Sequence, residues 1–329
     1  MNLHLFKKLH AEGLIGDDSL QKITLLEQRR LFSLFWELKT LLYLGVTLLS
    51  GGLGILIYKN IDSIGHTVIL TFIALISAGC YYYCFRKTTS FSIHKVPAPN
   101  PFFDYILLLG CLTFVSFIAY LQFQYTFFGT AYGLATFIPM VVLFFSAYYF
   151  DHLGILSLAI TNLAAWAGIA VTPLRILKEN DFSSGRLIYT GLALGVLLVL
   201  MGLLSERRNI KNHFEFTYTN FGTHILFVSG LAGLFVFDNI YPLWFLLLLG
   251  MAWYFYRQAM KKRSFYFLLI ITLYMYIALS YMVIRLLMLM RNADLAPIYL
   301  GLLYFILSAI GLIRVLIKLN KKVKAHDSL

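Results

Sequence analysis

The run that decides the fold is FFGTAYGLATFIPMVVLFFSAYYFDHLGILSLAITNLAAWAGIAV, residues 127–171. It is too long for one membrane crossing, which needs about 20 residues as a helix. Asp151 and His152 are the only acidic, basic or histidine side chains within it. A turn at these two residues would fold the run into two antiparallel spans. We therefore expect helices over residues 127–150 and 152–172.

The whole chain has the same character. Of its 329 residues, 60% are hydrophobic and only 13% are charged, whereas a soluble domain carries about 25% charged residues. This composition predicts an all-α polytopic integral membrane bundle of about ten transmembrane helices at roughly 20 residues each. The expected spans are 40–58, 66–85, 102–122, 127–150, 152–172, 187–204, 221–237, 240–256, 264–290 and 296–317.

Polar segments flank the predicted transmembrane domain of residues 40–317. Residues 1–39 are expected to form a short amphipathic helical hairpin in the cytoplasm, with Gly13 ending the first helix and Asp17 to Ser19 capping the second. No cleavable signal peptide is visible, so the span near Thr40 is expected to direct insertion. Residues 318–329 form a basic tail.

The distribution of basic residues predicts the orientation. With ten spans and an inner N-terminus, 21 of the 27 lysines and arginines fall in cytoplasmic segments, as the positive-inside rule requires. We therefore expect a multi-pass protein of the bacterial inner membrane with both termini in the cytoplasm. The net charge of +12 then indicates contact with anionic lipid headgroups and needs no nucleic acid. The basic residues left outside are Lys59, Arg175, Lys178, Arg186, Arg285 and Arg291.

Two stretches of the chain resemble each other at an offset of 179 residues. Ser50 to Ile61 reads SGGLGILIYKNI, and Ser229 to Ile240 reads SGLAGLFVFDNI. Residues 40–87 would then echo residues 221–257 as a parallel repeat, and transporter sites often lie at repeat interfaces. The competing interpretation is chance, because small residues recur wherever membrane helices pack closely.

The first 90 residues also carry a family resemblance. The motif Leu-x-x-x-Gly-Leu-Ile spans Leu9 to Ile15 and precedes Asp/Ser and a second helix. A glycine-rich first span follows, and its outer turn reads Asn60-Ile61-Asp62, with isoleucine where tryptophan is usual. In these features the chain resembles the bacterial predicted-membrane-protein family of domain of unknown function 2157. That family has no established activity, so the resemblance implies an architecture and no chemistry.

Motifs of catalysis and cofactor binding are missing from the sequence. There is no His-Glu-x-x-His motif and no P-loop, and Gly52-Leu-Gly54 lacks the third glycine of a dinucleotide fingerprint. Cys80, Cys84 and Cys111 lie in apolar segments, where we expect them to serve as small packing residues. We therefore predict no metal and no cofactor, and the sequence nominates no catalytic residue.

A few polar residues within or beside the spans are the remaining candidates. For substrate binding these are Asn60, Asp62, Asn239 and Arg285. Asp151 and His152 could relay protons, since histidine beside a carboxylate can do so near neutral pH; the alternative is a solvated two-residue turn. Arg285 could instead extend to the membrane surface. Asn162 and His224 are expected to form hydrogen bonds between helices, and Gly129-x-x-x-Gly133 and Gly191-x-x-x-Gly195 are packing signatures.

Two functions from different classes fit these observations. One is a carrier or flippase of a small or lipid-like substrate, which the repeat and the intramembrane polar residues favour. The other is a non-catalytic sensor or scaffold that docks a protein partner through residues 1–39. A membrane enzyme ranks third, because the polar residues are too scattered to form a reaction centre.

Overall fold

The computed structural model describes residues 9–10, 12–19, 35–59, 65–88, 91–100, 102–171, 184–289 and 296–325. These residues are helical or lie in turns and connections, with no strand among them. The chain divides into two compact units, residues 1–65 and 66–329. Asn60, Asp62 and most of the predicted hairpin of residues 1–39 lie outside the described residues, so those expectations stay predictions.

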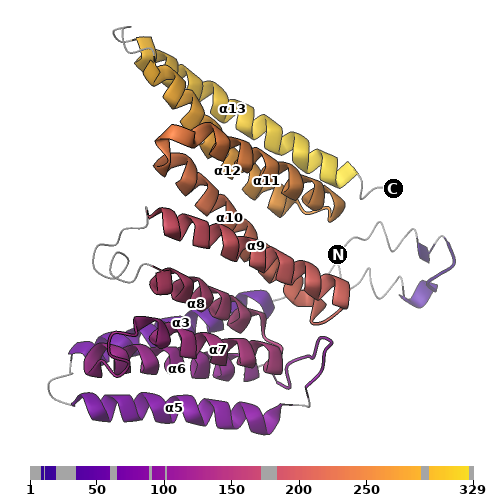
Figure 1. The fold of residues 1–329 in the computed structure, drawn as a ribbon. Coiled ribbons are helices and arrows are strands. Elements are labelled where there is room, and N and C mark those ends of the chain that lie inside the picture. Colours follow the sequence, from indigo (N-terminus) through magenta and orange to yellow (C-terminus); the bar gives the residue numbers. More distant parts are fainter. Residues whose placement is uncertain are drawn as a thin grey trace. The chain divides into compact units, whose positions relative to one another are not determined.

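Ten helices of the described residues are long and apolar enough to cross a membrane, which confirms the predicted class (Figure 1). The first unit contains α3. The second unit contains the other nine, which follow one another from α5 to α13. Their bounds are α3 Phe35–Lys59, α5 His66–Lys87, α6 Phe103–Tyr125, α7 Tyr132–Phe150, α8 Leu153–Val171, α9 Gly185–Arg208, α10 Glu215–Val236, α11 Tyr241–Lys261, α12 Phe265–Leu289 and α13 Ala296–Ala325.

The predicted breaks at residues 151–152 and 238–239 are where the structure has them, but three helix starts differ by five or six residues. Helix α3 begins at Phe35 and not at residue 40, and α7 begins at Tyr132 and not at residue 127, because residues 127–130 form a turn in which Gly129 has a φ of +55°. Helix α7 ends at Phe150 and α8 begins at Leu153, while a short 3-10 turn, η3 (Asp238–Ile240), separates α10 from α11. Helix α10 begins at Glu215, six residues before the predicted start. Hydropathy hid this first turn and a half because its polar residues, including Thr217 and Thr219, are buried against protein.

Successive helices of the second unit alternate in direction (Figure 1). We call the end at which α5, α7, α9 and α11 finish the basic end, since Arg86, Lys87, Arg207, Arg208 and Lys261 occupy the last turns there. Its connections are drawn on the right of Figure 1. The other end is called the opposite end.

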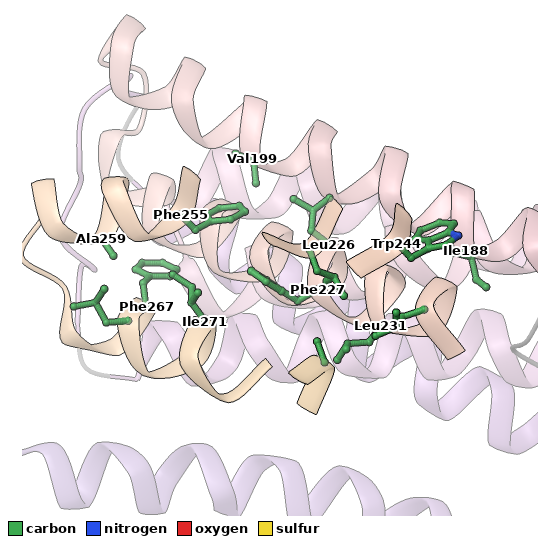
Figure 2. Packing of buried hydrophobic residues seen from close by; sticks show 14 of the residues in the cluster. Ile188, Val199, Leu226, Phe227, Leu231, Trp244, Phe255, Ala259, Phe267 and Ile271 are labelled. Carbon is green, nitrogen blue, oxygen red and sulfur yellow. The ribbon is translucent and has the colours of Figure 1, made fainter. Parts of the chain in front are cut away.

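Two buried clusters organise the second unit into two lobes. We call α5–α8 the first lobe and α9–α13 the second. The core of the first lobe includes Cys84, Leu107, Leu143 and Ile155, and it also takes in Leu198 of α9. The core of the second lobe joins α9–α13 through large side chains such as Phe227, Trp244, Phe255 and Phe267, which are labelled in Figure 2. Helices α9 and α10 contribute to both cores.

We call the region where the two lobes meet the seam. Helices α9 and α10 form the second lobe's side of the seam, and they pack closely against each other. A Cβ atom at Gly222 would lie 3.0 Å from the carbonyl oxygen of Gly195 and 2.8 Å from a methyl group of Val199. A Cβ at Gly191 would lie 2.2 Å from the Ser229 hydroxyl. The predicted Gly191-x-x-x-Gly195 packing signature is therefore confirmed. The signature at Gly129 is wrong, because that glycine has a φ of +55° in a turn and a Cβ added to it would meet nothing within 4 Å.

Candidate functional site

The main polar site is built around Asp151 at the basic end. Asp151 caps α7 in the left-handed conformation, with a φ of 60°, and its amide donates to the carbonyl of Ala147. This geometry turns the chain directly into α8. The predicted turn at residues 151–152 is thus confirmed, but it is not solvated: the Asp151 side chain is 1% exposed and His152 is 6% exposed.

Three groups from two other connections surround the Asp151 carboxylate. Lys211 Nζ lies 3.0 Å from Oδ1, and His213 Nε2 lies 2.7 Å from the same oxygen. The amide of Val96 donates to Oδ2 at 2.6 Å. A buried carboxylate needs such partners, because the unpaired charge would be strongly unfavourable. We call Asp151, Lys211 and His213 the latch.

Lys211 joins the lobes by its backbone as well as by its side chain. It has a φ of 48°, and its amide donates to the carbonyl of Ile93 at 2.8 Å. Its Nζ, in a side chain that is 1% exposed, also lies 3.4 Å from the carbonyl of His94. The latch therefore ties the α9–α10 connection of the second lobe to two connections of the first.

His152 has surroundings of its own. Its Nδ1 accepts a hydrogen bond of 3.1 Å from the amide of Ile155, as the side chain at a helix N-terminus does. Its Nε2 lies 4.0 Å from the Asp104 carboxylate of α6. The structure thus places the two predicted relay residues against different partners, and Asp151 faces His213 instead. His213 is 18% exposed, so it lies between the buried carboxylate and solvent.

A layer of buried and half-buried side chains, Tyr148, Leu198, Phe214 and Tyr218, lies next to the latch. The hydroxyls of Tyr148 in α7 and Tyr218 in α10 are 2.9 Å apart. Phe214 packs edge-on against Tyr148 at a centroid distance of 5.2 Å, and Leu198 is fully buried beside them. Latch and layer together close the seam between the lobes over the half of the bundle near the basic end.

The other half of the same seam is open. A groove of about 430 Å³ lies between α8 of the first lobe and α9 and α10 of the second, within the range of about 300–1,000 Å³ typical of small-molecule sites. Its lining residues lie in the halves of α8 and α9 near the opposite end, and on α10 from the middle of the helix toward that end. Its walls are mostly small and apolar, with Ala164 and Gly168 on α8, Leu194 and Gly191 on α9 and Ile225 on α10.

Arg285 and Asn239, two of the predicted binding residues, are near neighbours at the opposite end. Arg285 pairs with Asp238, which precedes Asn239 in η3. Its Nε donates to the Tyr281 hydroxyl at 2.9 Å, and its guanidinium lies 5.3 Å from the Tyr241 ring centroid. None of these residues lines the groove. The pairing favours the interpretation that Arg285 reaches toward the membrane surface.

The two predicted interhelical hydrogen bonds have different outcomes. His224 Nδ1 lies 2.8 Å from the Tyr274 hydroxyl of α12, which confirms a bond between helices. Asn162 instead donates to the carbonyl of Leu158 in its own helix, at 3.2 Å, so that prediction is wrong. Cys84 and Cys111 are fully buried free thiols, which confirms their packing role. Within the described residues, no group of three or more His, Cys, Asp or Glu could hold a metal ion.

A comparison with protein families bears on the first lobe. A family model described as Predicted membrane protein (DUF2157) matches the chain. Residues 7–156 match this family. The match confirms the resemblance seen in the first 90 residues and extends it to the turn at Asp151, whereas Lys211 and His213 lie beyond it. No curated protein and no solved structure matches the chain.

Sequence reasoning missed Lys211 and His213. Both stand in the short connection Asn209–Phe214, where a lysine and a histidine are expected to face water and lipid headgroups. The signal that could have identified a partner was Asp151 itself, the one carboxylate in a long apolar run. It indicated that a cation must lie nearby, but it did not indicate which of the many basic residues at that end would supply it.

Proposed function

We propose that this membrane protein is a carrier or flippase that moves a small or lipid-like substrate by alternating the access of the groove between its two lobes. In this proposal the basic end faces the cytoplasm, as the positive-inside rule favours. The described state then has its groove toward the outer half of the membrane and is closed on the cytoplasmic side.

One observation carries the proposal: a groove and a buried charged latch occupy the two halves of a single seam. Alternating access requires a site between two bodies that can open on one side while it closes on the other. A scaffold would need neither feature, since apolar packing would hold its lobes together without the cost of burying Asp151 and Lys211.

The contacts also indicate which parts would move. Helices α9 and α10 are in backbone contact near Gly195 and Gly222, so they should move as one body. The first lobe meets this pair through the latch, the Tyr148–Tyr218 contact and the groove wall. Release of Asp151 would free the basic end of the seam, and rocking of the lobes would then close the groove.

Cysteine accessibility tests the proposal. In a variant without the three native cysteines, Ala165→Cys places a thiol in the groove wall, and Leu198→Cys places one in the closed half. A membrane-impermeant maleimide should label residue 165 only from the side opposite the basic end and should not label residue 198. Adding Lys211→Met should expose residue 198 to reagent from the basic end and slow the labelling of residue 165.

The matched control is Lys262→Met, which removes a lysine at the same end but outside the latch. It should leave both labelling patterns unchanged. If residue 198 stays unreactive in the folded Lys211→Met protein, the two halves of the seam do not exchange and the carrier proposal fails.

A further inference from the structure

The chemistry of the groove narrows the class of substrate. Among the residues that the structure describes, the lining carries no charged side chain, and its polar side chains are those of Thr190 and Ser229, which carry hydroxyls. A sugar, an ion or an amino acid would lose its hydration there without gaining enough hydrogen bonds in return. An acyl chain loses nothing, because small apolar walls suit its methylene groups.

Ser229 and Thr217 are buried residues of α10 whose hydroxyls have no hydrogen-bond partner within the described residues, and of the two only Ser229 is among the residues that line the groove. Thr113, Thr223 and Ser146 each donate to a backbone carbonyl one turn earlier, at 2.7–2.8 Å. Ser229 is 8% exposed, and no partner for its hydroxyl exists in the part of the chain that the structure describes. The Ser229 hydroxyl in the groove wall can therefore donate a hydrogen bond to a bound ligand.

Arg186 is exposed, and it is the charged residue of α9 that lies nearest to the groove along the helix. It lies in the first turn of α9, four residues before Thr190, so it shares the face of that residue one turn nearer the opposite end. Ser229 lies level with Gly191, as their contact shows. Arg186 is five residues before Gly191, which puts the charge about 7.5 Å closer to the membrane surface than the free hydroxyl.

We propose that the groove binds one acyl chain of an anionic phospholipid, with the phosphate at Arg186 and the ester carbonyl accepting a hydrogen bond from Ser229. A phospholipid offers these groups in this order, with the phosphate outermost, the ester next and the apolar chain deepest. The proposal rests on the carrier function in that it names the substrate class of the same groove.

Photolabelling of the full chain in nanodiscs tests the lipid at this site. The probes are phosphatidylglycerol and phosphatidylcholine, each with a diazirine at the end of one acyl chain, and the labelled peptides are mapped by mass spectrometry. Phosphatidylglycerol should label the groove segments of α8, α9 and α10 more than phosphatidylcholine does. Arg186→Gln should lower this preference about fivefold, as one charge near the surface implies.

Matched variants separate the two contacts. Ser229→Ala should weaken groove labelling by both lipids equally, because both carry the ester, whereas Thr190→Val should not, because the Thr190 hydroxyl already donates to the carbonyl of Arg186. Arg207→Gln, at the basic end, should leave groove labelling unchanged. A preference for phosphatidylglycerol that survives Arg186→Gln, or equal labelling by the two lipids in the unmodified chain, would overturn the proposal. Selective photolabelling by phosphatidylglycerol, together with no effect of Lys211→Met on the labelling of residues 165 and 198 by maleimide, would overturn the carrier function but would support the lipid site.

Discussion

At the scale of single residues, the latch is a network of buried charged side chains. Substitutions can separate the free-energy cost of burying these charges from the benefit of pairing them. Asp151 and Lys211 are each 1% exposed, and removing one partner of such a pair leaves the other charge without compensation. Replacing both partners by neutral side chains of similar size is often close to neutral. We therefore expect the latch to determine how the lobes close against each other more than to raise the net free energy of unfolding.

Asp151→Asn tests this energy balance. Asparagine tolerates the left-handed backbone at this turn, so the variant changes the charge and little else. We expect a loss of about 3–5 kcal/mol in the free energy of unfolding, measured by chemical denaturation in detergent micelles, and substantial recovery in the double variant with Lys211→Met. Asp238→Asn is the control, since that exposed pair with Arg285 should contribute about 0–1 kcal/mol. Equal losses at the two aspartates would refute the assigned burial.

Lys262 is a second charged contact at the basic end, with a defined pH dependence. Its Nζ lies 2.8 Å from Glu206 and 2.9 Å from Glu215. Burial alone would lower the pKa of Lys262, but the hydrogen bonds and charges of the two carboxylates outweigh it, and the pKa is raised. A raised lysine pKa contributes stability that is fully present below the unfolded-state value of about 10.4 and is lost as the pH rises through the folded-state pKa.

Lys262→Gln should therefore lower the melting temperature at pH 7, and the difference from the unmodified chain should shrink above pH ~10.4. High salt should also reduce it, because the Glu206 side chain is 43% exposed. Melting curves across pH and salt in detergent check both trends. A difference that does not depend on pH would mean that packing by the lysine stem, and not its charge, stabilises the turn.

At the scale of helices, the α9–α10 pair is the element on which the two lobes depend. A methyl group at Gly222 would meet backbone atoms of Gly195 and Val199, and backbone cannot move aside as the end of a side chain can. Gly222→Ala should thus force the helices apart at a cost of about 1–3 kcal/mol. Gly250→Ala in α11 is the control, because nothing lies within 4 Å of its added Cβ.

The control should be neutral or stabilising by up to about 1 kcal/mol, because alanine favours a helix more than glycine does. Thermal denaturation in the same detergent compares the two variants. If Gly222→Ala is as harmless as Gly250→Ala, α9 and α10 are not in the close contact described here.

The sequence predicted where most helices lie, but it did not predict which distant residues contact each other, and the reason is physical. Hydropathy measures the fit of a segment to lipid, so it located the spans and the turn at Asp151. It mislocated the start of α10, where polar residues are buried against protein and not in lipid. The contacts of Asp151 with Lys211 and His213 join positions about 60 residues apart along the chain, and no local pattern encodes which distant cation meets a given carboxylate. The Gly191 and Gly195 signature succeeded because small residues on one helix face act through sterics alone.

At the scale of the whole molecule, only the second unit bears on the carrier proposal. Its two lobes share one seam, closed at the basic end and grooved at the other. The expected role of Asn60 and Asp62, and of a protein partner for residues 1–39, concerns the first unit and stays a prediction. For the second unit, we expect the lobes to separate at the basic end when the latch is broken.

The most direct measurement is a distance between the lobes at the basic end. Spin labels at Leu153→Cys in α8 and Arg208→Cys in α9, on a chain without its native cysteines, report the separation by pulsed electron resonance in nanodiscs. We predict one narrow distance distribution in the latched protein and a second, longer population when Lys211→Met is added, with Lys262→Met unchanged. A single distribution that Lys211→Met does not alter would contradict the account, because the latch would then hold together two lobes that never part.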